Sequence, residues 1–141
     1  MRISKRVARK EAVEHGFKSK FEFEFSKTLK KLKLHAEYEP DKFKFTQPEQ
    51  IRSYCPDWKI EEKVYIETKG RFTSADRKKI LWVIESNPDI KIYLLFMNSK
   101  VTLSKTSATS YGSWCDKNNI EWADIREIRK WKSWFKEGSN E

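Results

Sequence analysis

Residues 54–77 read YCPDWKIEEKVYIETKGRFTSADR, and the predicted fold is organised around this stretch. Its central part, residues 63–69, alternates as a β-strand does, with Val64 and Ile66 on one face. Glu67 and Lys69 fall together on the opposite face. Because two positions along a strand span about 6.6–6.8 Å, we expect the carboxylate of Glu67 and the ammonium of Lys69 to project side by side.

A second carboxylate precedes this strand in the pair Pro56-Asp57, with nine residues between Asp57 and Glu67. A Pro-Asp pair followed by Glu-Thr-Lys resembles the PD-(D/E)xK pattern of metal-dependent nucleases. The residue types suit that chemistry, because Mg²⁺ takes oxygen ligands and is held at phosphates by one or two carboxylates. A neighbouring lysine can steer a water and stabilise charge on phosphorus.

The alternative is a strand whose exposed face carries a glutamate and a lysine that pair across solvent. Glu-x-Lys triplets are common, so the triplet alone favours this simpler interpretation. The upstream Pro56-Asp57 and the exit from the strand at Gly70-Arg71 support the nuclease interpretation enough to balance the two.

Two longer segments carry a more specific signal. Residues 64–79, VYIETKGRFTSADRKK, and residues 106–124, TSATSYGSWCDKNNIEWAD, resemble the bacteriophage endonuclease I family, the Holliday-junction resolvases of T-odd phages. The resemblance runs from about residue 17 to residue 124. It implies an α/β fold with a restriction-endonuclease-like core, in which helices flank a mixed central sheet, and a homodimer that exchanges segments.

The resemblance also implies the site. Asp57 and Glu67 would hold Mg²⁺, assisted by the backbone carbonyl of Thr68 and by Glu22, and Lys69 would position or activate the water. Mn²⁺ would substitute for Mg²⁺, and no small-molecule cofactor is expected. The substrate would be branched DNA, with Glu22 reaching the site from the other protomer. The connector KFTQPEQIRSY departs from the family pattern, which bears on the exchange more than on the chemistry.

Glu22 has a second possible role, because residues 17–34 predict an amphipathic helix. Ser19 and Glu22 form the S-x-x-E signature of a capping box, in which Glu22 accepts a hydrogen bond from the Ser19 amide. Glu24 lies about 200° around that helix from Glu22 and is a nearby alternative.

Composition narrows the classes of partner. The 141 residues suffice for one domain, and the net charge of +9 favours a polyanionic partner, with nucleic acid ahead of an anionic membrane. No apolar run is long enough to span a bilayer, and the N-terminus lacks the apolar core of a secretory signal. Cys55 and Cys115 are expected to be free thiols, and a zinc site is not expected. The resemblance to the phage family further implies a cytoplasmic phage protein in its bacterial host.

Residues 1–12 predict a flexible basic arm, and residues 13–141 a single nuclease domain. The arm could equally be a solvated tail. The candidate DNA-contacting residues are Arg2, Lys5, Arg6, Arg9, Lys10, Lys18, Arg71, Arg77, Lys78, Lys79, Lys105 and Tyr111.

The remaining pattern predicts the other elements. Residues 36–46 indicate one extended strand, residues 46–54 a connector, and residues 61–63 a hairpin turn. A helix from Thr73 or Ser74 to about Glu85 and a buried strand at 90–97 complete a parallel βαβ unit. A short helix within 106–119, a strand at 120–122 and a last helix capped by Asp124 follow. The last helix has an apolar stripe of Ile125, Ile128, Trp131 and Trp134. Together with Phe43 and Phe45, this stripe offers surface for a dimer.

Two other functions fit these observations. A non-catalytic basic module could stack bases on Trp58 and Tyr111, but it would not explain an acidic pair amid phosphate-seeking cations. A nuclease with the same core could instead act on ordinary duplex DNA. No motif ranks junctions against other branches, since selectivity for shape comes from the geometry of a dimer.

Overall fold

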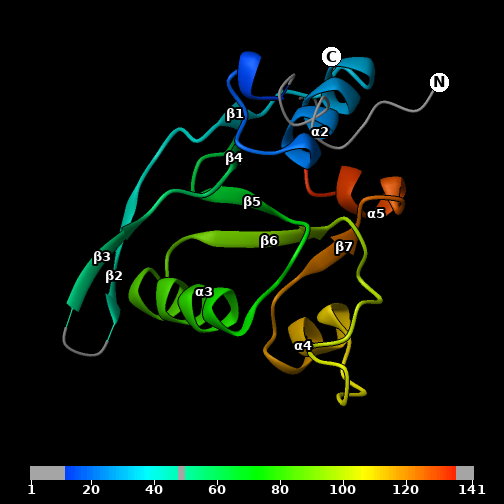
Figure 1. Cartoon of the computed structure of the whole chain (residues 1–141). Coiled ribbons are helices and arrows are strands. Elements are labelled where there is room, and N and C mark those ends of the chain that lie inside the picture. Colours follow the sequence, from blue (N-terminus) through cyan, green and yellow to red (C-terminus); the bar gives the residue numbers. More distant parts are fainter. Residues whose placement is uncertain (1–11, 48–49, 136–141) are drawn as a thin grey trace. The chain divides into compact units, whose positions relative to one another are not determined.

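The computed structural model describes residues 12–47 and 50–135, so the predicted basic arm lies almost wholly outside the described residues. The chain divides into two compact units, one of residues 1–35 with 137–141 and one of residues 36–136. Figure 1 shows the elements of both. No described helix is both long and apolar enough to cross a membrane.

The described part of the first unit contains helix α2, Lys20–Lys31. Its buried apolar residues are Phe21, Phe25 and Leu29, which recur at helical spacing and confirm the predicted amphipathic helix. Ser19 caps the helix by accepting a hydrogen bond from the Glu22 amide at 3.1 Å.

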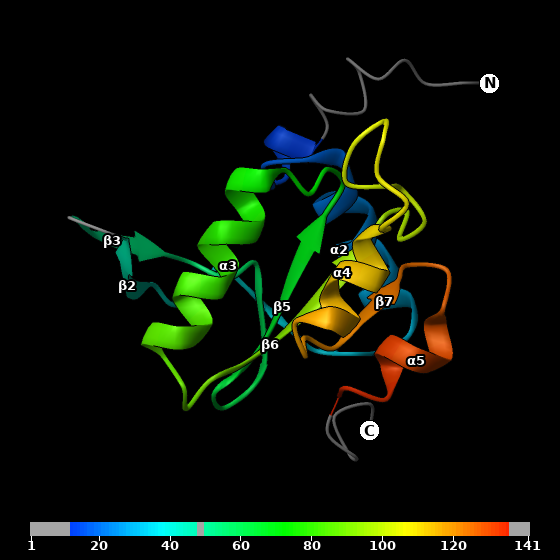
Figure 2. The same cartoon turned by 90° about the horizontal axis from the view of Figure 1, so that it is seen from below.

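The second unit is built on a five-stranded mixed sheet with the order β1-β4-β5-β6-β7. β5 and β6, and β6 and β7, are parallel, whereas β1–β4 and β4–β5 are antiparallel. A separate two-stranded hairpin of β2 and β3 lies beside helix α3 (Figures 1 and 2). The strands are β1 Glu37–Tyr38, β2 Phe43–Gln47, β3 Gln50–Tyr54, β4 Trp58–Glu61, β5 Val64–Lys69, β6 Lys91–Phe96 and β7 Trp122–Asp124.

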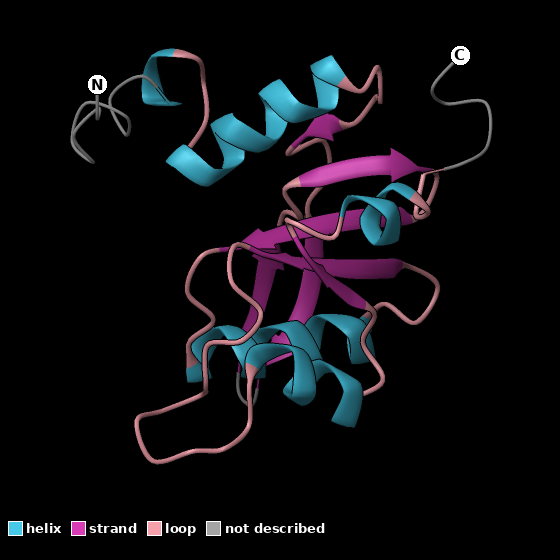
Figure 3. Cartoon of the chain, turned by 90° about the vertical axis from the view of Figure 1, so that its right-hand side faces the viewer, coloured by secondary structure: helices cyan, strands magenta, loops and turns pink. Residues whose placement is uncertain are grey.

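Helices cover both faces of this sheet. α3, Ser74–Ser86, and α4, Tyr111–Lys117, lie on one face, and α5, Ile128–Lys132, lies on the other (Figure 3). β6 separates the two layers because its side chains alternate. Ile92, Leu94 and Phe96 join the core cluster under α3 and α4, whereas the ring of Tyr93 stacks on Trp134 with centroids 4.4 Å apart.

Strong local signals predicted several of these elements correctly. The β5-α3-β6 unit has the parallel pairing expected of a βαβ segment, and Thr73 caps α3 as predicted. β4 and β5 form the expected hairpin, in which Lys63 takes the left-handed conformation at φ 64°. α4 begins after its cap Ser110, and both cysteines are free thiols.

Three predictions of local structure were wrong. Residues 36–46 do not form one strand, because β1 pairs with β4 in the main sheet while β2 pairs with β3. The supposed connector at 46–54 contains β3, which is stabilised by that pairing rather than by a strong strand pattern of its own. Asp124 does not cap α5, which begins after Glu127.

Asp124 instead ends β7 as a buried anchor. Its carboxylate accepts hydrogen bonds from the Ser99 amide and hydroxyl, at 2.9 and 3.1 Å, and from the backbone and guanidinium of Arg126. The Arg126 hydrogen bonds lower the pKa of Asp124 most; burial alone would raise it, and the Ser99 hydrogen bonds lower it further.

This anchor predicts the acid sensitivity of folding. An unfolded aspartate has a pKa of about 3.9, and the folded value lies below it, so the stabilisation is complete above about pH 4 and is lost as the pH falls. Asp124→Asn should lower the free energy of unfolding by about 1–3 kcal/mol at pH 7. It should also flatten the decline of stability between about pH 5 and pH 2. Urea unfolding at several pH values measures both effects; parallel curves for wild type and variant would contradict the assignment.

Candidate active site

The predicted carboxylate pair comes together where β4 begins opposite β5. Trp58 pairs with Ile66 in the antiparallel ladder, so the preceding Asp57 lies next to Glu67. The Asp57 amide donates a hydrogen bond to Glu67 Oε1 at 3.1 Å. Asp57 Oδ2 accepts from the Thr68 amide at 2.9 Å and from the Thr68 hydroxyl at 2.7 Å. Asp57 and Glu67 are 8% and 6% exposed, so both carboxylates are buried.

Lys69 lies beside Glu67, as the strand alternation predicted. Its Nζ is 3.2 Å from Glu67 Oε2 and 3.7 Å from Asp76 Oδ1. Burial alone would lower the pKa of Lys69, but the two carboxylates outweigh it and raise the pKa. The site therefore contains an ammonium ion held between two acidic side chains.

Asp76 was not among the residues predicted for the site. It completes a capping box at the start of α3: its Oδ2 accepts from the Thr73 amide at 3.0 Å, and its own amide donates to Thr73 Oγ1 at 3.1 Å. Burial would raise the pKa of Asp76, but Lys69 and the hydrogen bonds from Thr73 lower it. The T-x-x-D spacing was a usable signal for the cap, whereas the contact with Lys69 depends on the fold.

Tyr54 was also missed. It ends β3 and is 7% exposed, and its hydroxyl has no hydrogen-bond partner of good geometry among the described residues. Burial raises the pKa of this phenol well above its usual value, and the nearby carboxylates of Glu67 and Asp57 raise it further. Burial likewise raises the pKa of Glu67, while Lys69 opposes that effect.

These residues fit a hard metal ion. Asp57, Glu67 and the carbonyl of Thr68 supply oxygen donors, which Mg²⁺ prefers, and the Tyr54 hydroxyl is a buried polar group close to them. Among the described residues of this unit, no third acidic, histidine or cysteine side chain joins the pair. Mg²⁺ retains several waters in proteins, so two carboxylates are enough to hold it at a phosphate.

Glu22 belongs to the first unit, and its predicted role as a metal ligand stays a prediction. The predicted capping box of Ser19 and Glu22 is confirmed in one of its two hydrogen bonds, since the Glu22 amide donates to Ser19 Oγ. The reciprocal half was wrong: Glu22 Oε2 accepts from the Lys18 amide at 3.2 Å. The carboxylate is 8% exposed and thus buried.

The predicted DNA contacts fall into three groups. Arg2, Lys5, Arg6, Arg9 and Lys10 lie outside the described residues. Arg77 is half-buried, and its guanidinium donates to the Phe72 carbonyl at 2.7 Å, while Tyr111 is 7% exposed and belongs to the core. The remaining candidates are exposed: Lys18, Arg71, Lys78, Lys79 and Lys105.

An α/β unit with a buried carboxylate pair and an adjacent lysine is the arrangement expected of a phosphodiester-cleaving enzyme. Comparison with protein families agrees, because the model of the phage endonuclease I family matches residues 3–141.

Two relatives are similar over most of their length. Endodeoxyribonuclease 1 of Enterobacteria phage T3 is 40% identical over 109 residues, covering 77% of this chain and 72% of the relative. Endonuclease I of Escherichia phage T7 is 38% identical over 116 residues, covering 82% and 78%. The chain therefore belongs to the phage endonuclease I family and is an endonuclease.

The two members of the capping box allow a test of how Lys69 is positioned. Asp76→Ala and Thr73→Ala both break the cap, and each should cost about 0.5–2 kcal/mol of stability. Only Asp76→Ala also removes a partner of Lys69. Because small displacements of a positioned group cost large factors in rate, its single-turnover cleavage of DNA should be at least about tenfold slower than that of Thr73→Ala.

The rates are measured well below both melting temperatures, so that each variant is folded. Equal rates in the two variants would show that Asp76 serves the helix alone.

Proposed function

We propose that the protein is a Mg²⁺-dependent, structure-selective DNA endonuclease that cuts four-way junctions and other branched DNA, acting in the cytoplasm of the infected bacterium. The observation that carries the proposal is the cluster of Asp57, Glu67 and Lys69 in a chain of the endonuclease I family.

Asp57, Glu67 and the carbonyl of Thr68 would hold the metal, with Glu22 as a further ligand. When bound, Mg²⁺ would polarise a phosphoryl oxygen and make a water a better nucleophile, and Mn²⁺ would substitute for it. The protein's part is to fix the donors. The Thr68 amide and hydroxyl hold Asp57 Oδ2, and the Asp57 amide and Lys69 hold the two oxygens of Glu67.

Lys69 would act as a cation at the scissile phosphate. Its ammonium pairs with both Glu67 and Asp76. These two contacts anchor it, and it can still donate a hydrogen bond to a water or a phosphate oxygen. A positioned donor of this kind stabilises negative charge that develops in the transition state.

The structure weakens the alternative of a non-catalytic binding module. The two aromatic residues offered for base stacking, Trp58 and Tyr111, are 2% and 7% exposed. Neither ring presents a face to solvent on which a base could stack. A buried acidic pair, by contrast, has an evident purpose in a nuclease and none in a protein that only binds phosphate.

Removing either acidic charge should stop cleavage. With Mg²⁺, wild type should cut a synthetic four-way junction faster than its separate linear arms, and EDTA should abolish cutting. Asp57→Asn and Glu67→Gln should each lower the rate by at least about 10²-fold, the scale of losing one element of transition-state stabilisation. Binding of the junction should be unchanged or tighter, since a negative charge near phosphate is gone. Gel assays of cleavage and fluorescence anisotropy measure both quantities.

Glu121→Gln is the matched control, because Glu121 is an exposed carboxylate that pairs with Lys91 at the surface. It should cleave as wild type does. Cleavage within tenfold of wild type in both site variants would remove the proposed site. Equal rates on the junction and its linear arms would instead indicate an enzyme for ordinary duplex.

We further propose a homodimer, because a four-way junction has symmetry-related strands and a two-fold dimer supplies two sites in fixed relation. The apolar stripe does not support this proposal as predicted. Trp131, Trp134 and Phe45 are all buried in the single chain. The large apolar side chains that remain most exposed include Ile51, 75% exposed on β3, and Ile128, 44% exposed.

Mixed dimers test whether segments are exchanged. If Glu22 of one protomer completes the site of the other, a Glu22→Gln chain combined with a Glu67→Gln chain should regain one intact site. The mixture should then nick a junction without cutting both strands, whereas each variant alone should be inactive. Light scattering at micromolar concentration measures the assembly. A stable monomer would end the dimer proposal, and an inactive mixed dimer would end only the exchange.

A further inference from the structure

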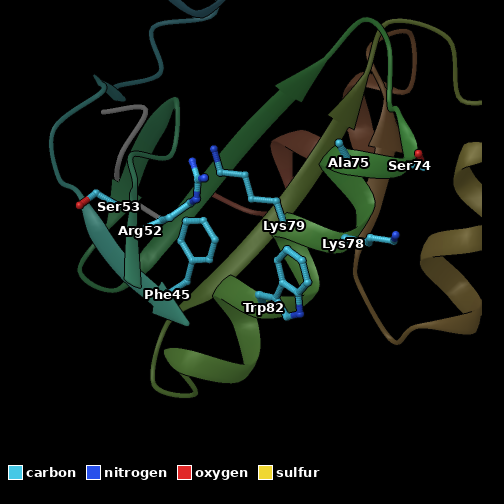
Figure 4. Close-up of a pocket in the computed structure, with 8 residues that line it drawn as sticks. All are labelled: Phe45, Arg52, Ser53, Ser74, Ala75, Lys78, Lys79 and Trp82. Atoms are coloured by element: carbon cyan, nitrogen blue, oxygen red, sulfur yellow. The ribbon is translucent and has the colours of Figure 1, made fainter. Parts of the chain in front are cut away.

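A groove with a volume of about 680 Å³ lies between the β2–β3 hairpin and α3 (Figure 4). It is distinct from the carboxylate pair, and none of the described residues that line it is acidic. Its lining residues are Phe45, Arg52, Ser53, Ser74, Ala75, Lys78, Lys79 and Trp82.

The sequence of α3 produces one wall of this groove. Ile80 and Val83 are buried under the helix, while Lys78 and Lys79 precede Trp82 by four and three positions and therefore neighbour it on the helix surface. The β2–β3 hairpin forms the other wall, and hydrogen bonds to the C-terminal end of the same helix hold it in place. The Thr46 amide donates to Ser86 Oγ at 3.1 Å, and Asn87 Nδ2 donates to the Lys44 carbonyl at 3.0 Å. The groove is therefore formed before any ligand binds.

The charge of the groove fits an anion. Arg52, Lys78 and Lys79 all line it, and neither lysine forms an ion pair with a described residue. Figure 4 shows the two lysine side chains diverging, with Lys79 running toward Arg52. Two separate cationic positions suit the two phosphates that flank a single nucleotide.

The aromatic side chains of the groove narrow the class of ligand further. Trp82 is only half-buried, and in Figure 4 its ring lies below the two diverging lysines, close to Phe45. Phe45 is 3% exposed and forms the floor, with Lys79 Nζ 5.8 Å from the centre of its ring. An indole gains from stacking on the face of a base. In duplex DNA those faces are stacked inside the helix, so such a surface serves an unpaired nucleotide better than a paired one.

The groove also adjoins the carboxylate site through Tyr54. Lys79 Nζ lies 5.3 Å from the centre of the Tyr54 ring, and the hydroxyl of that tyrosine lies beside Glu67. A strand that leaves the groove therefore has a short path to the carboxylate pair. Branched DNAs with single-stranded segments, such as forks and flaps, offer unpaired nucleotides where strands part, whereas a fully paired four-way junction does not.

We propose that this groove binds one unpaired nucleotide of the DNA substrate, with its phosphates at Lys78, Lys79 and Arg52 and its base on Trp82. The inference rests on the proposed function in that the substrate is DNA. It adds a site that distinguishes DNA with unpaired nucleotides from continuous duplex.

The test compares a blunt duplex with the same duplex carrying a short single-stranded extension, each with a fluorescent label. Dissociation constants are measured by anisotropy in EDTA, so that no cleavage occurs. Wild type should bind the extended duplex more tightly. Trp82→Ala should weaken that binding about tenfold while changing the blunt duplex less than twofold, because one stacked base is lost. Trp82→Phe should retain most of the preference.

The double variant Lys78→Gln, Lys79→Gln keeps the test valid if Trp82→Ala folds poorly, since both lysines are exposed. It should reduce the preference for the extended duplex and the salt dependence of binding it. Lys132→Gln, an exposed lysine on α5 outside the groove, is the control and should do neither. Equal losses on the two DNAs would show a surface for duplex phosphates and overturn the proposal, as would unchanged binding in both groove variants.

The outcome is separable from that of the proposed function. A wild type that cuts no junction but prefers the extended duplex through Trp82 would leave the groove standing. A wild type that cuts junctions while Trp82→Ala and the double lysine variant bind normally would remove the groove and leave the nuclease.

Discussion

The hydrogen bonds between Asp57 and the Glu67–Thr68 segment are the interaction on which the site depends. Burying two carboxylates a few ångströms apart is unfavourable unless hydrogen bonds and an opposite charge compensate. The backbone supplies part of that compensation, because the Thr68 amide binds Asp57 and the Asp57 amide binds Glu67. Strand pairing therefore sets the relative position of the two acids without a metal ion. An apolar pair here would be expected to stabilise the fold at the expense of the chemistry.

A second polar contact connects β5 to α3, the helix that follows it. Lys69 ends β5, and Asp76 both caps α3 and contacts the Lys69 ammonium. The carboxyl end of a parallel strand and the first turn of its crossover helix are neighbours in any βαβ unit. Asp76, which caps the start of α3, can therefore also contact Lys69 without any additional structural element.

The elements that local signals determine were predicted correctly from the sequence. α3 was found through its cap, β6 through its continuous apolar run, and the Glu67–Lys69 neighbourhood through strand alternation. Prediction failed where distant partners decide: β3 exists because it pairs with β2, and Asp124 binds Ser99, which lies 25 positions earlier in the sequence. The burial of Tyr54 and of Tyr111 could not be predicted either, since it follows from packing against segments that are distant in the sequence.

Acidic side chains at the active site of a DNA-cleaving protein repel the phosphates of DNA. In this chain, burial of the two carboxylates reduces that repulsion. Asp57 and Glu67 are nearly inaccessible and are neutralised in part by Lys69, so they present little repulsion to approaching phosphate. Lys78 and Lys79, which form no ion pair with a residue that the structure describes, are exposed on the flank of α3. Long-range attraction therefore comes from the surface, while the negative charge acts only at contact distance. Under the proposed function, that separation would allow one small protein to attract DNA through a positive field and still offer a metal ion two carboxylates.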